Sequence, residues 1–129
     1  MSPAPTYHVV VVEDDSVLAD FLAKRLAIAN LACVHYANGL DAVAGILSNQ
    51  QIDLILLDIS LPDIDGFEVL KRIQTDPRAA QIPVVIASNF SQEKDLEWGK
   101  KLGVKRFLNK ASVTPSEIVD VALEVIAQK

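Results

Sequence analysis

The chain has 129 residues, 50% of them hydrophobic, and its formal net charge at neutral pH is −5. This length and composition suffice for one buried core without disulfide or metal support, so we expect a single domain over residues 1–129 with no output domain. The excess of acidic side chains repels phosphate backbones and anionic lipid surfaces, which argues against direct binding of nucleic acid or membranes.

The first half of the chain alternates strand-like and helical patterns. Residues 7–12 (YHVVVV) form a β-branched run typical of a strand that is covered on both faces. Apolar residues at helical spacing then predict a helix from Ser16 to near Asn30. A shorter strand is expected over 32–37, and a helix capped by Asn38 follows it.

The second half of the chain continues the same alternation. Strands are expected over 52–57, 84–87 and 106–109. Helices are expected around 67–73, over 92–102, and from Thr114 and Pro115 to the C-terminus. The helix over 92–102 contains Gly99, which costs about 1 kcal/mol relative to alanine, so we expect this helix to be the least stable.

Five strands alternating with five helices predict a doubly wound α/β domain with a parallel sheet, because the connections are too short for anything but right-handed crossovers. In such sheets the functional site lies at the carboxyl ends of the strands. Polar side chains follow four of the five strands at that edge. They are Glu13, Asp14 and Asp15 after the first strand, Asp58 after the third, Ser88 after the fourth and Lys110 after the fifth.

The clustered carboxylates predict a cation site at this edge. Carboxylates held together raise one another's pKa unless a cation lies among them. Mg²⁺ prefers such oxygen ligands and often bridges one or two carboxylates to a phosphoryl group. Lys110 and Ser88 suit the remaining phosphoryl oxygens, by charge and by hydrogen bonding. Asp15, by contrast, is expected to be a helix cap.

Four motifs resemble those of the response-regulator receiver domains of two-component phosphorelays, both in their residues and in their order along the chain. They are VVVVEDD (Val9 to Asp15), LLDISLPDIDG (Leu56 to Gly66), VVIASN (Val84 to Asn89) and GVKRFLNK (Gly103 to Lys110). The resemblance covers nearly the whole chain. It implies the CheY-like, flavodoxin-like (βα)5 fold, with five parallel strands in the order 2-1-3-4-5.

The resemblance also implies roles for the residues at the strand ends. Asp58 would accept the phosphoryl group, and Asp14, Asp58 and the backbone carbonyl of Ser60 would bind Mg²⁺. Glu13 would hold a metal-bound water, and Lys110 would contact the phosphoryl group.

Two further residues would form the conformational switch of such a domain. Ser88 would supply the switch hydroxyl and Phe107 the switch aromatic ring. Phosphorylation would then shift the surface formed by residues 92–102, the last strand and the last helix.

The resemblance further implies a cytoplasmic signalling switch rather than an enzyme with an external substrate. Its phosphodonor would be a sensor histidine kinase or a phosphotransfer protein, and its output a downstream protein partner. The single cysteine, Cys33, and the absence of a secretory signal or long apolar run agree with the cytosol. The alternative is a pseudo-receiver that binds partners without phosphorylation.

Other functions fit the residues less well. A dehalogenase-type phosphatase needs a second acid two residues beyond the acceptor, where this chain has Ser60. A flavodoxin-like flavin binder needs a Gly/Ser/Thr-rich phosphate loop at the first turn, where carboxylates lie. His8 and His35 lie in strands and are expected to pack in the core or at an edge.

The chain departs from the receiver pattern in three places. Ala111 follows Lys110 where the family usually has a proline, so we expect a trans peptide bond and a locally different path into the last helix. Asn89 is larger than the usual small residue after Ser88 and could narrow access to the phosphoryl group. Phe107 lacks the hydroxyl of a tyrosine.

The last helix carries apolar residues around much of its circumference. Ile118, Val121, Ala122 and Val125 form the expected core stripe, which Val119, Leu123 and Ile126 extend around the side. Two interpretations stay open: a broadly buried helix, or an exposed apolar patch that serves a homodimer or another partner.

Overall fold

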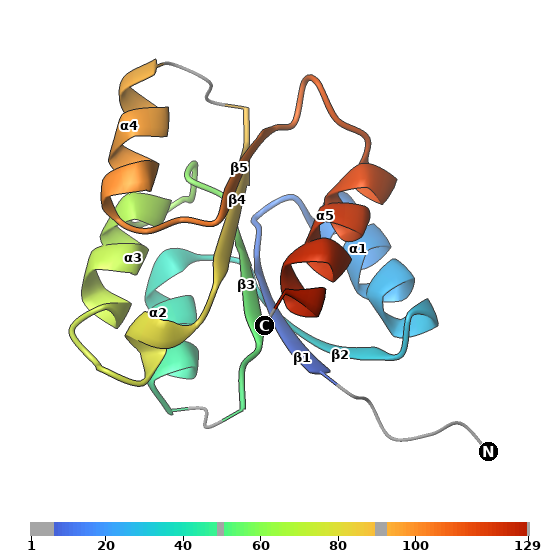
Figure 1. Cartoon of the computed structure of the whole chain (residues 1–129), viewed down its shortest axis with the longest axis horizontal. Coiled ribbons are helices and arrows are strands. Elements are labelled where there is room, and N and C mark those ends of the chain that lie inside the picture. The colour runs from blue at the N-terminus through green and yellow to red at the C-terminus, as the bar shows by residue number, and fades with distance from the viewer. Residues whose placement is uncertain (1–6, 49–50, 90–92, 129) are drawn as a thin grey trace.

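Five parallel strands form one sheet in the order β2-β1-β3-β4-β5 (Figure 1). The computed structural model describes residues 7–48, 51–89 and 93–128. The strands are β1 (Tyr7–Val12), β2 (Leu31–Tyr36), β3 (Leu54–Leu57), β4 (Val84–Ser88) and β5 (Arg106–Asn109). The helices are α1 (Ser16–Ile28), α2 (Gly39–Ser48), α3 (Gly66–Ile73), the short 3₁₀ helix η1 (Ala79–Gln81), α4 (Glu93–Lys101) and α5 (Pro115–Ala127). The predicted doubly wound fold and strand order are confirmed.

Helices cover both faces of the sheet. In Figure 1, α1 and α5 lie on one side of the strands and α2, α3 and α4 on the other. Alternate residues of β1 enter the two cores: Val9 and Val11 pack with α1 and α5, whereas Val10 and Val12 pack on the opposite face. All four valines are at most 2% exposed, as a strand covered on both faces requires.

Several boundaries differ from the predicted ones. The helix α1 ends at Ile28 rather than near Asn30, because Asn30 adopts a left-handed backbone conformation with a φ of 62°. The strand β3 begins at Leu54 rather than at residue 52, since its pairing with β1 starts with Val9 and Leu54. Gln92, the predicted start of the fourth helix, and the C-terminal residue 129 lie outside the described residues.

Side-chain caps begin the helices that border the carboxyl edge of the sheet. Asp15 accepts hydrogen bonds from the backbone amides of Val17 and Leu18, which confirms that it is the N-cap of α1. Asp65 caps α3 in the same way. Thr114 begins α5 with a capping box, ahead of a proline at the first helical position. These caps fix where each loop of the edge meets its helix.

The broadly buried interpretation of α5 is correct. Val119 and Ile126, which extend its apolar stripe, are only 5% and 4% exposed, and Leu123 is half-buried. The interpretation of an exposed apolar patch on α5 is therefore wrong, and with it the argument for a homodimer through this helix. Among the described residues, no helix is long and apolar enough to cross a bilayer.

Candidate functional site at the carboxyl edge of the sheet

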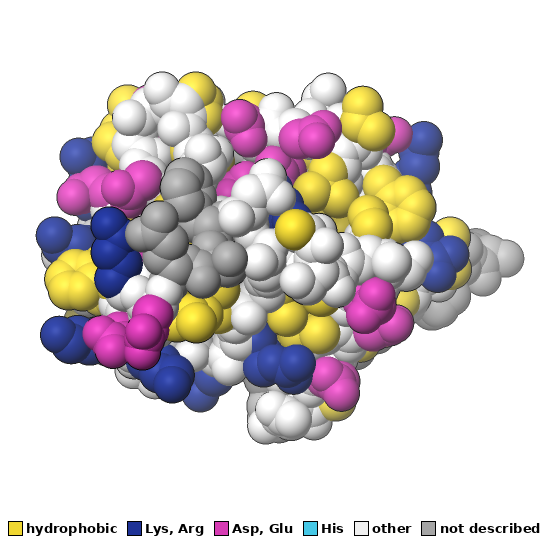
Figure 2. Space-filling view, turned by 90° about the horizontal axis from the view of Figure 1, so that it is seen from above, with side chains coloured by type: hydrophobic (Ala, Val, Ile, Leu, Met, Phe, Trp, Pro, Cys, Tyr) yellow, Lys and Arg dark blue, Asp and Glu magenta, His cyan; other side chains and the backbone are white. Residues whose placement is uncertain are grey.

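Three carboxylates meet where β1 and β3 end. One oxygen from each of Glu13, Asp14 and Asp58 lies within 4.8 Å of the others. Glu13 and Asp58 are 3% and 5% exposed, whereas Asp14 is exposed to solvent. Seen from above in Figure 2, this end of the molecule carries several acidic side chains next to hydrophobic ones. The loops therefore bury two of the carboxylates and leave the third at the surface.

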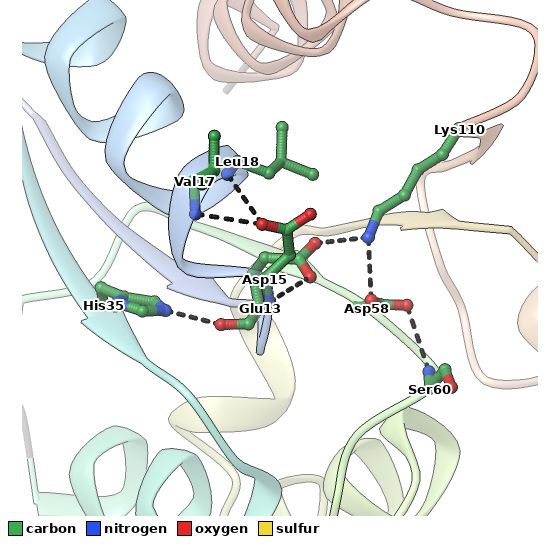
Figure 3. A network of polar contacts seen from close by, with 8 residues as sticks. All are labelled: Glu13, Asp15, Val17, Leu18, His35, Asp58, Ser60 and Lys110. Carbon is green, nitrogen blue, oxygen red and sulfur yellow. Dashed lines mark hydrogen bonds and ion pairs between the residues drawn. The ribbon is translucent and has the colours of Figure 1, made fainter.

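Lys110 reaches into this cluster from the end of β5. Its Nζ atom donates to Glu13 Oε1 at 2.5 Å and to Asp58 Oδ2 at 2.8 Å (Figure 3). Burial alone would lower the pKa of the ammonium group, but the hydrogen bonds and charges of Asp58 and Glu13 outweigh it and raise the pKa above its ordinary value. Lys110 is therefore a permanent positive charge between two buried carboxylates.

The pKa of the Glu13 carboxyl group is strongly raised. Burial raises its pKa from 4.5 to about 7, and the nearby charge of Asp58 adds to this rise. The hydrogen bonds from Lys110 and from the backbone amide of Asp15 lower the pKa, but they offset only part of the rise. Near neutral pH, Glu13 therefore exchanges between its protonated and ionised forms unless further positive charge arrives.

A tight turn holds Asp58 at the end of β3. Its Oδ1 atom accepts a hydrogen bond from the backbone amide of Ser60 at 3.1 Å, and the amide of Gly66 donates to the carbonyl of Ile59. A Cβ atom at Gly66 would lie 2.5 Å from the carbonyl oxygen of Asp58, so only glycine fits this close approach. The path of the loop depends on that glycine.

Ser88 and Phe107 lie on the adjacent strands β4 and β5. Ser88 is fully buried at the end of β4, and its backbone carbonyl accepts from the amide of Lys110 at 2.9 Å. The half-buried ring of Phe107 lies against α4, where a Cβ atom at Gly99 would be 3.3 Å from the ring and 3.9 Å from Ile86. The missing side chain of Gly99 thus leaves room for the ring.

The loop after Lys110 has the predicted trans geometry. No cis peptide bond occurs among the described residues, which include the bond between Lys110 and Ala111. The amide of Ala111 donates to the Oδ1 atom of Asn109 at 2.9 Å, and the amide of Ser112 donates to the carbonyl of the same residue. A proline at position 111 could not make the first bond, so an Asx turn shapes this loop.

The model of the response regulator receiver domain matches residues 9–122 of this chain. The chain belongs to this family. It is 31% identical over 103 residues to the DNA-binding dual master transcriptional regulator RpaA of Synechocystis, an alignment covering 80% of this chain and 42% of that protein. This receiver domain spans less than two thirds of the length of the first curated relatives that it matches.

Solved receiver structures share the fold over nearly the whole chain. The phosphorylated cyanobacterial phytochrome response regulator RcpA superposes with a TM-score of 0.79 at 29% identity, covering 92% of this chain and 90% of that one. The Mn²⁺-bound form of the response regulator Rcp1 gives a TM-score of 0.79 at 25% identity, covering 92% and 91%. Receiver domains of this kind take part in two-component signalling.

The donor set of this receiver domain fits a small divalent cation. Glu13, Asp14 and Asp58 offer hard carboxylate oxygens within reach of one another, which is the chemistry that Mg²⁺ prefers. Asp14 is exposed, so an ion can reach the cluster from solvent while it keeps several of its waters. The acidic cluster is typical of a receiver's metal site.

Two contacts at this edge were not predicted from the sequence. His35 Nε2 hydrogen-bonds the backbone carbonyl of Glu13 at 2.6 Å, and both carboxylate oxygens of Asp63 accept from the amides of Gly39 and Leu40 at 2.8 Å. The sequence places His35 in a strand and Asp63 in a turn. No local pattern signals either contact, because each joins residues more than twenty positions apart.

Proposed function

We propose that this receiver domain is the phosphoacceptor switch of a two-component phosphorelay, with Asp58 as the acceptor. The observation that supports this best is the setting of Asp58: buried at the carboxyl edge, 2.8 Å from Lys110 and grouped with Glu13 and Asp14. The phosphodonor is a sensor histidine kinase or a phosphotransfer protein. The family and the acidic cluster support the proposal.

In the proposed reaction, a carboxylate oxygen of Asp58 attacks the phosphorus of a phosphohistidine on the donor. An O–P bond forms, the P–N bond breaks with its electron pair returning to the imidazole, and an acyl phosphate results. Lys110 offsets negative charge on the transferred phosphoryl oxygens, so it exchanges its contact with Asp58 for a contact with the phosphoryl group. Asp14, Asp58 and the Ser60 carbonyl would hold Mg²⁺, and Glu13 would hold a water beside it; the ion would supply further charge neutralisation.

Water can reverse the modification by hydrolysing the acyl phosphate. The rate of this hydrolysis depends on access to the phosphorus, and the exposed residues Ser60 and Asn89 are proposed to flank the approach. The larger Asn89 is proposed to narrow the approach and so lengthen the lifetime of the phosphorylated state.

The proposed readout uses Ser88 and Phe107. The Ser88 hydroxyl hydrogen-bonds the phosphoryl group, and Phe107 turns further inward from its place beside Gly99. The change reaches the surface of α4, β5 and α5, where a downstream protein partner responds. Residues 1–129 act as one regulatory unit in the cytoplasm, which modifies only itself and processes no external substrate.

The decisive test is covalent labelling. Incubation with Mg²⁺ and acetyl phosphate is expected to add one phosphoryl group, seen by intact mass, in the wild type but not in Asp58→Asn. Asp53→Asn is the matched control, since Asp53 immediately precedes the same strand at its opposite end, and it is expected to be labelled like the wild type.

Omission of Mg²⁺ is expected to abolish the labelling. If the wild type gains no phosphoryl group and binds no Mg²⁺ by calorimetry, the chain acts as a pseudo-receiver and the proposal is overturned. Labelling that persists in Asp58→Asn would move the acceptor to another side chain.

A further inference from the structure

One short segment contacts both acidic loops of the site. Residues 35–40, which we call the β2–α2 junction, contact both the β1–α1 loop (13–15) and the β3–α3 loop (58–65). Hydrogen bonds join the junction to each loop, although its own residues lie outside the carboxylate cluster.

The first set of hydrogen bonds joins the junction to Glu13. The backbone amide of Glu13 donates to the carbonyl of Tyr36 at 3.0 Å, and the Nε2 atom of His35 lies 2.6 Å from the carbonyl oxygen of Glu13 (Figure 3). A carbonyl oxygen can only accept, so Nε2 must carry the proton. Both backbone polar groups of Glu13 are therefore held by β2, one by main chain and one by the imidazole.

The second set of hydrogen bonds joins the junction to the β3–α3 loop. Asp63 places one carboxylate oxygen 2.8 Å from the amide of Gly39 and the other 2.8 Å from the amide of Leu40, at the start of α2. A carboxylate at a helix N-terminus is stabilised by unpaired amides and by the helix dipole. Desolvation raises the pKa of Asp63, but the hydrogen bonds from Leu40 and Gly39 outweigh it and lower the pKa below 3.8.

We propose that the β2–α2 junction is a positioning element for the site, with His35 and Asp63 as its positioning residues. The inference rests on the proposed function, since it concerns how the acceptor and the cation ligands are held. His35 fixes the backbone from which Glu13 and Asp14 project. Asp63 fixes the loop that carries the Ser60 carbonyl. Neither side chain touches the reacting atoms.

The physical reason lies in how carboxylate sites bind cations. Three like charges and an ordered carbonyl must be brought together before the ion arrives, and free loops would move the carboxylates apart. Groups that orient metal ligands from outside typically change metal affinity about 10- to 100-fold when removed. Because His35 and Asp63 are exposed, we expect changes at or below the lower end of that range.

The test compares Asp63→Ala and His35→Phe with the wild type. Each variant is expected to weaken Mg²⁺ binding measured by calorimetry about 3- to 10-fold. The phosphorylation rate with acetyl phosphate should fall at low Mg²⁺ and return to within about twofold of the wild type at saturating Mg²⁺. This split between cation affinity and maximal rate is not expected from a general loss of stability.

Two matched variants control for charge and ring loss. Asp20→Ala removes an exposed carboxylate from α1, where Asp20 pairs with Lys24 outside the junction and both loops. His8→Phe replaces the other histidine, in β1. Both controls are expected to bind Mg²⁺ like the wild type.

Two further measurements separate positioning from folding. His35→Gln, which keeps a side-chain N–H donor, is expected to recover most of the Mg²⁺ affinity lost in His35→Phe. In Asp63→Ala without metal, the amide protons of Gly39 and Leu40 should exchange faster, while those of β1 should not.

The inference and the proposed function fail separately. If the wild type takes no phosphoryl group, the proposed function fails. If the wild type is labelled but Asp63→Ala and His35→Phe match it in Mg²⁺ affinity, the junction has no positioning role and the inference is overturned. A fall in the maximal rate at saturating Mg²⁺ with unchanged affinity would overturn it as well.

Discussion

The ionic cluster at the carboxyl edge and the ion pairs on the helix surfaces have similar N···O distances, but they differ in how strongly water screens their charges. Lys110 lies 2.5 and 2.8 Å from two carboxylates that are about 5% exposed. Lys24 lies 2.9 Å from Asp20 on α1, but these two side chains are 74% and 64% exposed. Water screens the surface pair, whereas the cluster interacts at short range in a medium of lower dielectric constant.

This comparison shows why charge alone does not identify a functional site. Surface pairs such as Glu68 with Arg72 follow helical spacing and stabilise their own helix slightly. The cluster instead joins residues that directly follow three different strands, and one of its carboxyl groups has a pKa of about 7. Buried charge of this kind is costly for folding and is typical of functional sites, which agrees with the acidic cluster of a receiver's metal site.

The largest effect is expected from removing the positive charge of Lys110 from the cluster. Without metal at pH 8, Lys110→Met should lower the free energy of unfolding by about 3 to 4 kcal/mol, because two buried carboxylates lose their partner. The loss should shrink towards pH 5, where protonation of Glu13 removes uncompensated charge. Urea unfolding in the presence of a chelator measures this. Lys94→Met, at an exposed position, is the control and should change stability little.

The second expected effect is a pH dependence that comes from Glu13. Its pKa of about 7 in the folded protein lies above the ordinary 4.5, so its favourable contribution is complete below pH 4.5 and is lost as the pH rises through 7. Relative to metal-free Glu13→Gln, the metal-free wild type should lose about 2 to 3 kcal/mol of stability between pH 4.5 and 8. Parallel stability curves for the two proteins would contradict this.

A smaller effect is expected from Asp63, which is exposed but hydrogen-bonded. Its pKa is lowered, so its contribution is present above pH 3.8 and is lost as the pH falls through the folded-state pKa. Asp63→Asn should therefore be less stable than the wild type at neutral pH, with the difference narrowing in acid. Acid titration followed by circular dichroism checks this. A difference that grows as the pH falls would refute it.

The smallest effect is expected from the surface pair on α1. A double-mutant cycle of Asp20→Ala and Lys24→Ala should give a coupling energy of about 0.3 to 0.5 kcal/mol that vanishes at high salt. A coupling as large as that expected for the buried cluster would remove the distinction between the two regions.

Local pattern and composition predicted most of the fold. The β-branched run of β1, the helical periods and the caps Asp15 and Thr114 all act within a few residues, so the sequence shows them directly. Parallel strands with short crossovers then place Glu13 and Asp58 at the same edge. The four receiver motifs led to the correct family by resemblance, and that resemblance also implied the strand order that the sheet shows.

What the sequence left open depends on how distant segments meet. Periodicity shows that α5 is apolar nearly all round, but only the packed structure shows that Val119 and Ile126 are covered. Phe21 lies one residue before the buried Leu22 on the apolar side of α1, and yet it is 38% exposed. Burial depends on which neighbours cover a side chain, and spacing within one helix does not determine that.

The sequence by itself determined the doubly wound receiver fold and the set of charged residues at the carboxyl edge. The tertiary structure decided that Lys110 joins Glu13 and Asp58, and that His35 and Asp63 tie both acidic loops to the β2–α2 junction. These contacts span from 22 to 97 residues along the chain. They exist because the sheet brings its strand ends together, and no local pattern encodes a distance of that kind.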